Sequence, residues 1–266
     1  MIEHHADPAL HAAMDANMVA FWSAYGRGDG CSLLQSGDTV SFYTGVPHPL
    51  FNGVPRAGVE ARDIDSAANA LQARIDGHGA PAFWWIGSAA PADVRASLER
   101  RGLKAAGEVP AMALDLHALD DRPPDVASFS VELVGGETQA LWARTAAIGT
   151  GLPDPAVAEL SRVEASLTDA AYRAQLRYIG YLDGRPVACA ALVLEAGVAG
   201  VYAIATVPDA RHRGIGRYLT QLPLLEARNR GYKVAVLQAS PMGYPIYDKL
   251  GFRVVGRYSL YLQTGQ

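Results

Sequence analysis

The sequence predicts an α/β fold of two tandem domains, each with a mixed central sheet flanked by helices. Segments with strand character alternate with amphipathic helical segments along all 266 residues. Residues 83–109 and 233–259 resemble each other, and "ERRGLKAAG" in the first matches "DKLGFRVVG" in the second. Between the two halves lies "HALDDRPPDVAS", a polar stretch with two prolines that is typical of a linker. We therefore expect domains at residues 1–118 and 128–266, joined by residues 119–127.

The first half begins with a helix in residues 8–25, because Leu10, Met14, Met18 and Phe21 recur at helical spacing before "GRGDG" ends it. Apolar alternation, helix patterns and turn residues then predict the remaining elements in order. These are strands at 39–46 and 49–54, a helix at 63–76, a strand at 81–88, a helix at 91–102, and a final strand or hairpin at 103–116.

The second half shows the same alternation, with an Asp-Gly hairpin turn at Asp183 and Gly184. The predicted helix that starts at residue 213 follows the last of three consecutive strands. The expected order is a strand at 129–134, helices at 137–148 and 155–168, strands at 176–184, 185–197 and 198–207, a helix at 213–229, a strand at 233–240, a helix at 243–251 and a strand at 252–262.

The composition is that of a globular protein, with 50% hydrophobic and 19% charged residues. The formal net charge of −4 argues against general nucleic-acid binding, which usually needs a basic balance. The N-terminus lacks the basic and apolar regions of a signal peptide, and no apolar run reaches membrane-spanning length. We expect a cytoplasmic protein, a monomer or homodimer, with neither nucleic acid nor membrane as a partner.

Cysteine and histidine residues give little sign of a metal or disulfide framework. Cys31 and Cys189 are far apart in the sequence, and the apolar run around Cys189 predicts a buried thiol. His4 and His5 are adjacent metal-ligating side chains, but no second ligand pair lies near them in the sequence. We therefore expect no metal site.

The segment "VPDARHRGIGRYL" at 207–219 predicts an anion-binding turn between a strand and a helix. The start of a helix exposes unpaired N–H groups, and glycines allow a ligand to approach the backbone closely. Arg211, Arg213 and Arg217 add positive charge for a polyanion. A plain surface turn remains an alternative. The P-loop pattern is absent, and Leu219 occupies the third glycine position of the dinucleotide pattern.

The same segment resembles the acetyl-CoA-binding motif of the GNAT superfamily of N-acetyltransferases, Arg/Gln-x-x-Gly-x-Gly/Ala after a strand that ends in valine. Val207, Arg211, Gly214 and Gly216 match this pattern. "IYDKLGF" is similar to the Tyr-x-x-x-Gly-Phe signature of the family and lies at a matching distance downstream. The resemblance covers residues 128–266 and implies two GNAT-like domains in tandem.

The resemblance also implies where acetyl-CoA, the acyl donor, would bind. The strands "VYAIATV" and "KVAVLQAS" would run parallel and splay apart, and pantetheine would lie between them. Backbone groups of Ala205, Thr206 and Val207 would pair with pantetheine. Ser240 stands where many relatives have an asparagine that contacts pantetheine, and its hydroxyl could still bond an amide. The pyrophosphate would lie on the N–H groups of Arg211, His212, Arg213, Gly214, Ile215, Gly216 and Arg217.

Tyr247 matches the family tyrosine that protonates the departing thiolate, although a buried structural tyrosine is the alternative. Many relatives carry a catalytic glutamate on the strand before the phosphate turn, and "GVYAIAT" has no carboxylate. Tyr202, Glu195, Glu164 or a water chain are the candidates for a general base, and the sequence does not choose among them.

The first half has no Arg-x-x-Gly-x-Gly turn. Glu60, Asp63 and Asp65 crowd the corresponding helix start, where carboxylates would repel pyrophosphate. We therefore expect one acetyl-CoA site, in the second half, and a first half that covers the acceptor side. The resulting hypothesis is an N-acetyltransferase that acts on a primary amine of a small molecule by direct attack in a ternary complex. A non-catalytic acyl-CoA sensor and a protein N-acetyltransferase are the alternatives.

Overall fold

The computed structural model describes residues 1–88, 90–167 and 175–265. The first half contains α1 (Leu10–Tyr25), β1 (Ser32–Ser36), β2 (Thr39–Tyr43), η1 (Pro49–Phe51), β3 (Asn52–Arg56), α2 (Ala61–His78), β4 (Ala82–Gly87), α3 (Ala92–Arg100), β5 (Lys104–Asp115) and η2 (Leu116–Ala118). The second half contains β6 (Phe129–Leu133), α4 (Gln139–Thr150), α5 (Asp154–Ser166), β7 (Leu176–Leu182), β8 (Arg185–Glu195), β9 (Val198–Thr206), η3 (Pro208–Ala210), α7 (Ile215–Asn229), β10 (Val234–Gln238), α8 (Tyr244–Lys249) and β11 (Arg253–Gln263).

These elements confirm most of the predicted segments. One difference stands out, because β1 was not predicted. Of the two alternatives predicted for residues 103–116, the structure has the single long strand β5. Residue 168, the predicted end of the helix at 155–168, lies outside the described residues. No helix in the described part of the chain combines the length and the apolar character needed to cross a membrane.

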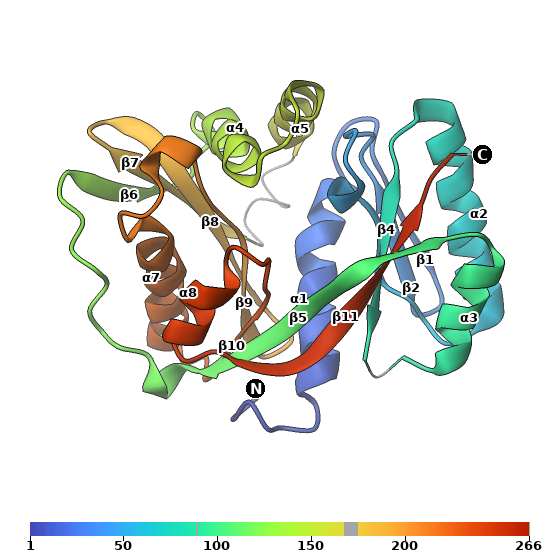
Figure 1. Ribbon diagram of the computed structural model, residues 1–266, viewed down its shortest axis with the longest axis horizontal. Helices are drawn as coiled ribbons and strands as arrows, with labels where there is room; N and C mark the ends of the chain where they lie inside the picture. The colour runs from blue at the N-terminus through green and yellow to red at the C-terminus, as the bar shows by residue number, and fades with distance from the viewer. Residues whose placement is uncertain (89, 168–174, 266) are drawn as a thin grey trace.

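The strands form one continuous sheet, in the order β1-β2-β3-β4-β11-β5-β10-β9-β8-β7-β6. The last strand of each half pairs with the other half: β5 pairs with β10, and β11 pairs with β4. At the centre β5 and β11 pair with each other in antiparallel orientation, and both cross the molecule diagonally (Figure 1). The two halves therefore exchange strands and share a sheet.

Each half contains a short parallel strand pair at an equivalent place. In the second half Ala199 and Gly200 of β9 pair with Ala235 and Val236 of β10. In the first half Gly53 and Val54 of β3 pair in the same way with two residues of β4. Each parallel pairing is two residues long. In each half an α-helix, α2 or α7, lies in the chain between the two paired strands, as expected for a duplicated unit.

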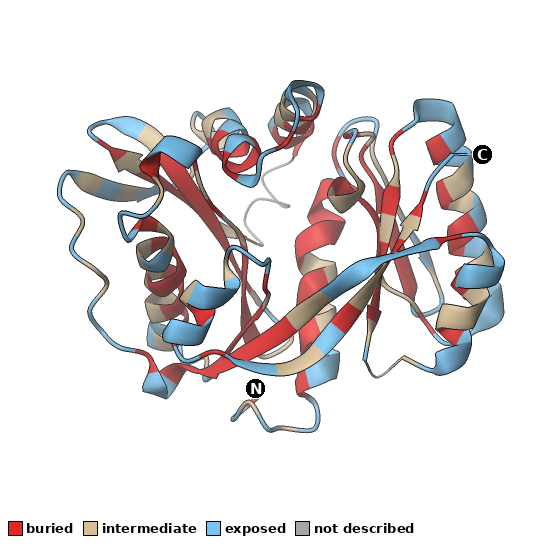
Figure 2. Ribbon diagram, in the orientation of Figure 1, coloured by how far each residue is buried: buried red, intermediate tan, exposed pale blue. Residues whose placement is uncertain are grey.

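Helices cover both faces of the sheet. α7 and α8 pack on the outer face of the second half, in a core that contains Leu219, Tyr247 and Phe252. α2 and α3 do the same in the first half, around Trp84 and Leu98. The inner face carries α1, α4 and α5, whose core draws on both halves. α1 lies between the halves and is largely buried (Figure 2).

Asn17 ties α1 to the second half. Its buried amide nitrogen donates to the carbonyl oxygens of Val193, Glu195 and Val198 at 3.0–3.2 Å. Gly200 makes this close approach possible, because a Cβ there would lie 1.9 Å from the amide oxygen of Asn17. A helix from the first half is therefore fixed against β8 and β9.

The strand exchange leads to a prediction about the isolated second half. A fragment of residues 126–266 keeps the phosphate turn but lacks β5, which separates β10 from β11. Both strands would then present open edges, which favour association with other chains. We expect the fragment to aggregate or to lose acetyl transfer to amines, while any soluble part still binds acetyl-CoA.

Gel filtration, acetyl-CoA titration and an amine acetylation assay on the fragment and the full chain test this. Mixing the fragment with residues 1–125 provides the control, because it resupplies β4 and β5 and should recover activity. A monomeric fragment with the full activity of the intact chain would contradict the prediction.

Candidate functional site

The predicted phosphate turn forms the start of α7. Gly214 precedes the helix with a left-handed backbone, φ 84°, and His212 has φ 63°. The N–H groups of Ile215, Gly216 and Arg217 lie in the first turn of the helix, where no carbonyl within the helix can accept them. A Cβ on Gly216 would lie 3.3 Å from Cδ1 of Ile246 and 3.8 Å from Oγ1 of Thr206. Gly216 thus allows the helix start to lie close to the end of β9 and to α8, and the N–H groups of the first turn suit an anionic group.

The arginines of this turn have different surroundings. The guanidinium of Arg211 donates to the carbonyl oxygens of Thr206 and Gly149, both at 3.0 Å, and so ties the end of β9 to α4. Arg213 and Arg217 are exposed beside the helix start. Arg217 lies 4.0 Å from a carboxylate oxygen of Asp120 in the linker. Arg213 and Arg217 therefore supply charge at the surface, whereas Arg211 holds the turn in shape.

The strands on either side of the predicted pantetheine site run parallel, as expected. Their paired register among the described residues ends at Gly200 and Val236, while β9 continues to Thr206. A bulge interrupts the pairing of β9 with β8, and within it Ala203 has φ 49°. Beyond Gly200 the edge of β9 is therefore not paired with β10, and its backbone groups there could pair with an extended ligand.

At the end of β9, some backbone N–H groups point toward β8 and others toward the edge that β10 does not pair with. The N–H of Val207 donates to the carbonyl of Val187 at 2.8 Å, so it points toward β8. Because successive residues of a strand point their N–H groups in opposite directions, the N–H of Thr206 faces the open edge. Ala205 is paired with Cys189 in the sheet. Of the three predicted residues, Thr206 thus offers the backbone donor with the best direction.

Ser240 and Tyr247 both contact Gly243, at the end of the loop between β10 and α8. The hydroxyl of Ser240 accepts a hydrogen bond from the N–H of Gly243 at 3.1 Å, which shapes this loop. The ring of Tyr247 packs over Gly243, whose Cβ position would lie 2.9 Å from the phenol oxygen. Burial raises the pKa of Tyr247 well above its ordinary value. A phenol is protonated at neutral pH in any case, as a general acid requires, and the raised pKa makes it a weaker acid than an exposed tyrosine.

The general base candidates of the sequence lie in unsuitable places. Tyr202 is buried and donates its hydroxyl to Oδ1 of Asn17 at 2.8 Å, and burial raises its pKa far above the usual value. Glu164 is fully buried in an ion pair with Arg177. Glu195 is at the turn between β8 and β9, at the opposite end of β9 from the phosphate turn. Of the three, only Tyr202 is next to the bulge in the sequence, and its raised pKa disfavours a role as a base.

A carboxyl group that the sequence analysis missed lies on α1. The hydroxyl of Tyr258 donates to Oδ1 of Asp15 at 2.5 Å. Burial raises the pKa of Asp15, although Tyr258, His11 and Arg56 act to lower it. Tyr258 and Tyr202 both belong to the core on the α1 face, and the charge of Asp15 raises the pKa of Tyr202 further. Asp15 therefore lies on the inner face near Tyr202, the residue before the bulge. Its distance in sequence from the motifs explains why no local pattern indicated it.

The corresponding turn of the first half is filled by its own carboxylate. Asp63, in the first turn of α2, accepts a hydrogen bond from the hydroxyl of Ser36 at 2.9 Å. A Cβ on Gly37 would lie 2.1 Å from the carboxylate of Asp63. Asp65 pairs with Arg101. A carboxylate and the β1–β2 turn thus occupy the place that corresponds to the phosphate turn.

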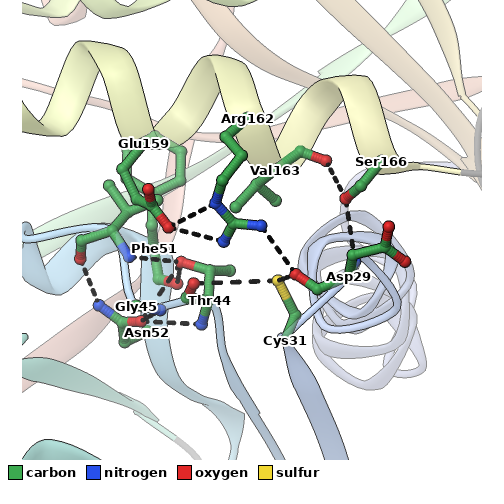
Figure 3. A network of polar contacts seen from close by, with 11 residues as sticks. Asp29, Cys31, Thr44, Gly45, Phe51, Asn52, Glu159, Arg162, Val163 and Ser166 are labelled. Atoms are coloured by element: carbon green, nitrogen blue, oxygen red, sulfur yellow. Dashed lines mark hydrogen bonds and ion pairs between the residues drawn. The ribbon is translucent and has the colours of Figure 1, made fainter. Parts of the chain in front are cut away.

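Polar contacts close the inner face between α5 and the first half (Figure 3). Arg162 of α5 donates to the carbonyl of Asp29 at 3.0 Å, and Ser166 accepts from the N–H of Asp29 at 2.9 Å. Cys31 follows, with its thiol 3.9 Å from the carbonyl of Thr44. Burial raises the pKa of Cys31, so its thiol is not activated. The network therefore connects the two halves structurally.

Comparison with known proteins agrees with this geometry. Residues 174–254 match the acetyltransferase (GNAT) domain family. The chain resembles a GCN5-related N-acetyltransferase from Kribbella flavida, with 18% identity, a TM-score of 0.63, and 94% of this chain and 96% of that chain covered. It also resembles a GCN5-related N-acetyltransferase from Sphaerobacter thermophilus, with 18% identity and a TM-score of 0.57. That similarity covers 88% of this chain and 76% of that chain.

A third similar structure is a tandem GNAT protein from the clavulanic acid biosynthesis pathway. It is 16% identical, with a TM-score of 0.61, and the similarity covers 93% of this chain and 87% of that chain. At these identities the structures establish the fold, while the family match concerns the segment with the phosphate turn. Residues 174–254 therefore resemble a GNAT acetyltransferase domain, and the chain as a whole shares the fold of these structures, one of which is a tandem GNAT protein.

Proposed function

We propose that the protein transfers an acetyl group from acetyl-CoA to the primary amine of a small molecule by direct attack in a ternary complex. The observation that carries this proposal is the splayed pair β9 and β10, with the glycine turn of α7 at its open end. An extended thioester donor needs both features, a free strand edge for its amides and a helix start for its phosphates. Bound acetyl-CoA would supply the activated acyl group.

Groups of the chain itself would bind acetyl-CoA and orient it for the reaction. The first-turn N–H groups of α7 and the exposed Arg213 and Arg217 would hold the pyrophosphate. The N–H of Thr206 would pair with pantetheine along the edge of β9. Backbone N–H groups at the bulge around Ala203 would stabilise negative charge that develops on the carbonyl oxygen. Holding the two reactants together would account for much of the rate.

Two side chains would move protons. Tyr247 would protonate the leaving thiolate, since a phenol carries its proton at neutral pH. Asp15 would bind the acceptor ammonium group and take up its proton, a role that fits a partly buried carboxylate with a raised pKa. Tyr258 would position this carboxylate through its hydrogen bond.

The contacts that α1 and α5 make across the inner face favour a small acceptor over a protein chain. α1 lies against β8 and β9, and α5 is joined to the first half by Arg162. An extended polypeptide acceptor would need an open groove along this face. The first half would thus cover the acceptor, and its filled turn at Asp63 supports a single acetyl-CoA site per chain.

The test is the release of free CoA from acetyl-CoA in the presence of a panel of small primary amines, monitored with a thiol reagent. Turnover with at least one amine supports the proposal. Stoichiometric acetyl-CoA binding without turnover of any amine or N-terminal peptide would favour an acyl-CoA sensor. Turnover confined to peptides would favour a protein N-acetyltransferase.

Gly216→Asp should abolish acetyl-CoA binding and leave the fold intact. An acidic residue suits the helix start, but its charge repels a pyrophosphate a few ångströms away, at a cost on the order of several kcal/mol. We expect affinity to fall at least ~100-fold by calorimetry. Gly216→Asn has the same shape without the charge, so it should lose less affinity than Gly216→Asp, and the difference between the two variants reports the charge. Wild-type affinity in both variants would place the phosphates elsewhere, and two sites per wild-type chain would contradict a single site.

Tyr247→Phe should lower turnover by roughly 10²–10⁴-fold and leave acetyl-CoA affinity nearly unchanged, because only the proton is lost. Tyr244→Phe, at an exposed position of the same helix, is the matched control and should keep wild-type turnover. Steady-state kinetics and calorimetry on both variants provide the measurement. Wild-type turnover in the Tyr247 variant would leave this residue a structural role alone.

Asp15→Asn should reduce amine acetylation by roughly 10²–10⁴-fold, since the amide cannot take up a proton but can still accept the hydrogen bond of Tyr258. The ratio of wild-type to variant kcat/KM should rise with pH, because the carboxyl group of Asp15 ionises only above a raised pKa. Asp93→Asn, exposed at the start of α3, is the control. A ratio near one at all pH values would exclude Asp15 from proton transfer.

A further inference from the structure

The N-terminal segment crosses the end of the shared sheet and is fixed there by polar contacts. The N–H of Ile2 donates to the carbonyl of Gly197 at 3.2 Å, in the turn between β8 and β9. Glu3 pairs with Lys233, directly before β10. His4 and His5 then lie beside Asp115, the last residue of β5. The segment thus contacts strands of both halves within its first five residues.

Histidine and aspartate, the residue types at this point, both bind metal ions in other proteins. Nε2 of His4 lies 2.8 Å and Nδ1 of His5 lies 2.5 Å from the same carboxylate oxygen, Oδ2 of Asp115. The other carboxylate oxygen accepts the N–H of His5 at 2.7 Å, so the carboxylate is held with Oδ2 turned toward both rings. One potential ligand atom from each residue lies within 4.8 Å of the others.

We propose that His4, His5 and Asp115 form a binding site for a divalent transition metal of the Zn²⁺ class. Two imidazoles and a carboxylate are a common ligand set for Zn²⁺, with water as the fourth ligand. Asp115 is nearly buried, His5 is partly exposed and His4 is largely exposed, so the site has a rigid base and an open side. A metal there would connect the N-terminus to the strand that passes from one half to the other.

Only a small adjustment separates the present contacts from a metal-bound arrangement. Ligand bonds of about 2.0–2.1 Å in tetrahedral geometry require ligand atoms about 3.3 Å apart. The nitrogen atoms now lie closer than this to Oδ2, at hydrogen-bond distance. Rotation of the exposed imidazole of His4 and a small shift of His5 would open the space, while the backbone contact of His5 keeps Asp115 in place.

The site lies at the opposite end of β10 from the proposed acyl-transfer site. Asp115 pairs with Val234, the first residue of β10, whereas the splay lies at the other end of that strand. Metal binding and acetyl transfer can therefore be measured separately, and the failure of one leaves the other standing.

Isothermal titration of the full chain with Zn²⁺, after removal of bound metal by EDTA, tests the proposal. We expect one ion per chain, tetrahedral visible absorption when Co²⁺ replaces Zn²⁺, and a higher unfolding temperature with metal. His4→Ala and His5→Ala should each raise the dissociation constant by at least about 10-fold and remove the absorption. His78→Ala, an exposed histidine at the end of α2, should change neither.

The largely exposed His4 makes its alanine variant safe for the fold, which circular dichroism would verify. The absence of stoichiometric binding in the wild type would overturn the site. So would unchanged binding in both the His4 and His5 variants, because the ion would then be held by other groups.

Discussion

The exchange of β5 and β11 is the constraint on which the other features depend. With β11 between β4 and β5, and β5 against β10, neither half can complete its sheet from its own strands. The same exchange places β11, with Tyr258, on the inner face near α1. The proposed acceptor side is therefore assembled from both halves, whereas the phosphate turn lies within the second half alone.

Buried polar groups fix how the halves meet on this inner face. Arg177 lies in the core, with its guanidinium paired to Glu164 and 4.5 Å from the ring centre of Trp142. Gln175 accepts from Arg177 and donates to the carbonyl of Phe21 on α1 at 2.9 Å. Removing one partner of such a pair costs more than the pair itself contributes, because the other charge stays buried. We infer that this network fixes the position of α1 against the second half, in addition to its effect on stability.

Local patterns predicted the elements and the phosphate turn because both depend on neighbouring residues. The alternation of apolar residues located nearly all helices and strands, and the glycines at 214 and 216 located the start of α7. The pairing of the strands could not be predicted in this way, because nothing in the sequence of β5 distinguishes pairing with β10 from pairing within its own half. Groups brought together by that pairing, such as His5 and Asp115 or Asp15 and Tyr258, were for the same reason not predicted. Arg211 was correctly placed in the turn, but the carbonyl of Gly149 that it contacts lies 62 residues away.

The central antiparallel pair of β5 and β11 relates the two halves as two subunits would be related in a strand-swapped homodimer. In such a dimer each subunit contributes its last strand to its neighbour, and both copies carry the same sequence. A linker that joins the copies into one chain removes that requirement. The two halves then differ at equivalent places, with Asp63 beside the β1–β2 turn in the first and the glycine turn at Gly214 in the second. Under the proposed function, fusion of the copies would let one half bind the donor while the other covers the acceptor.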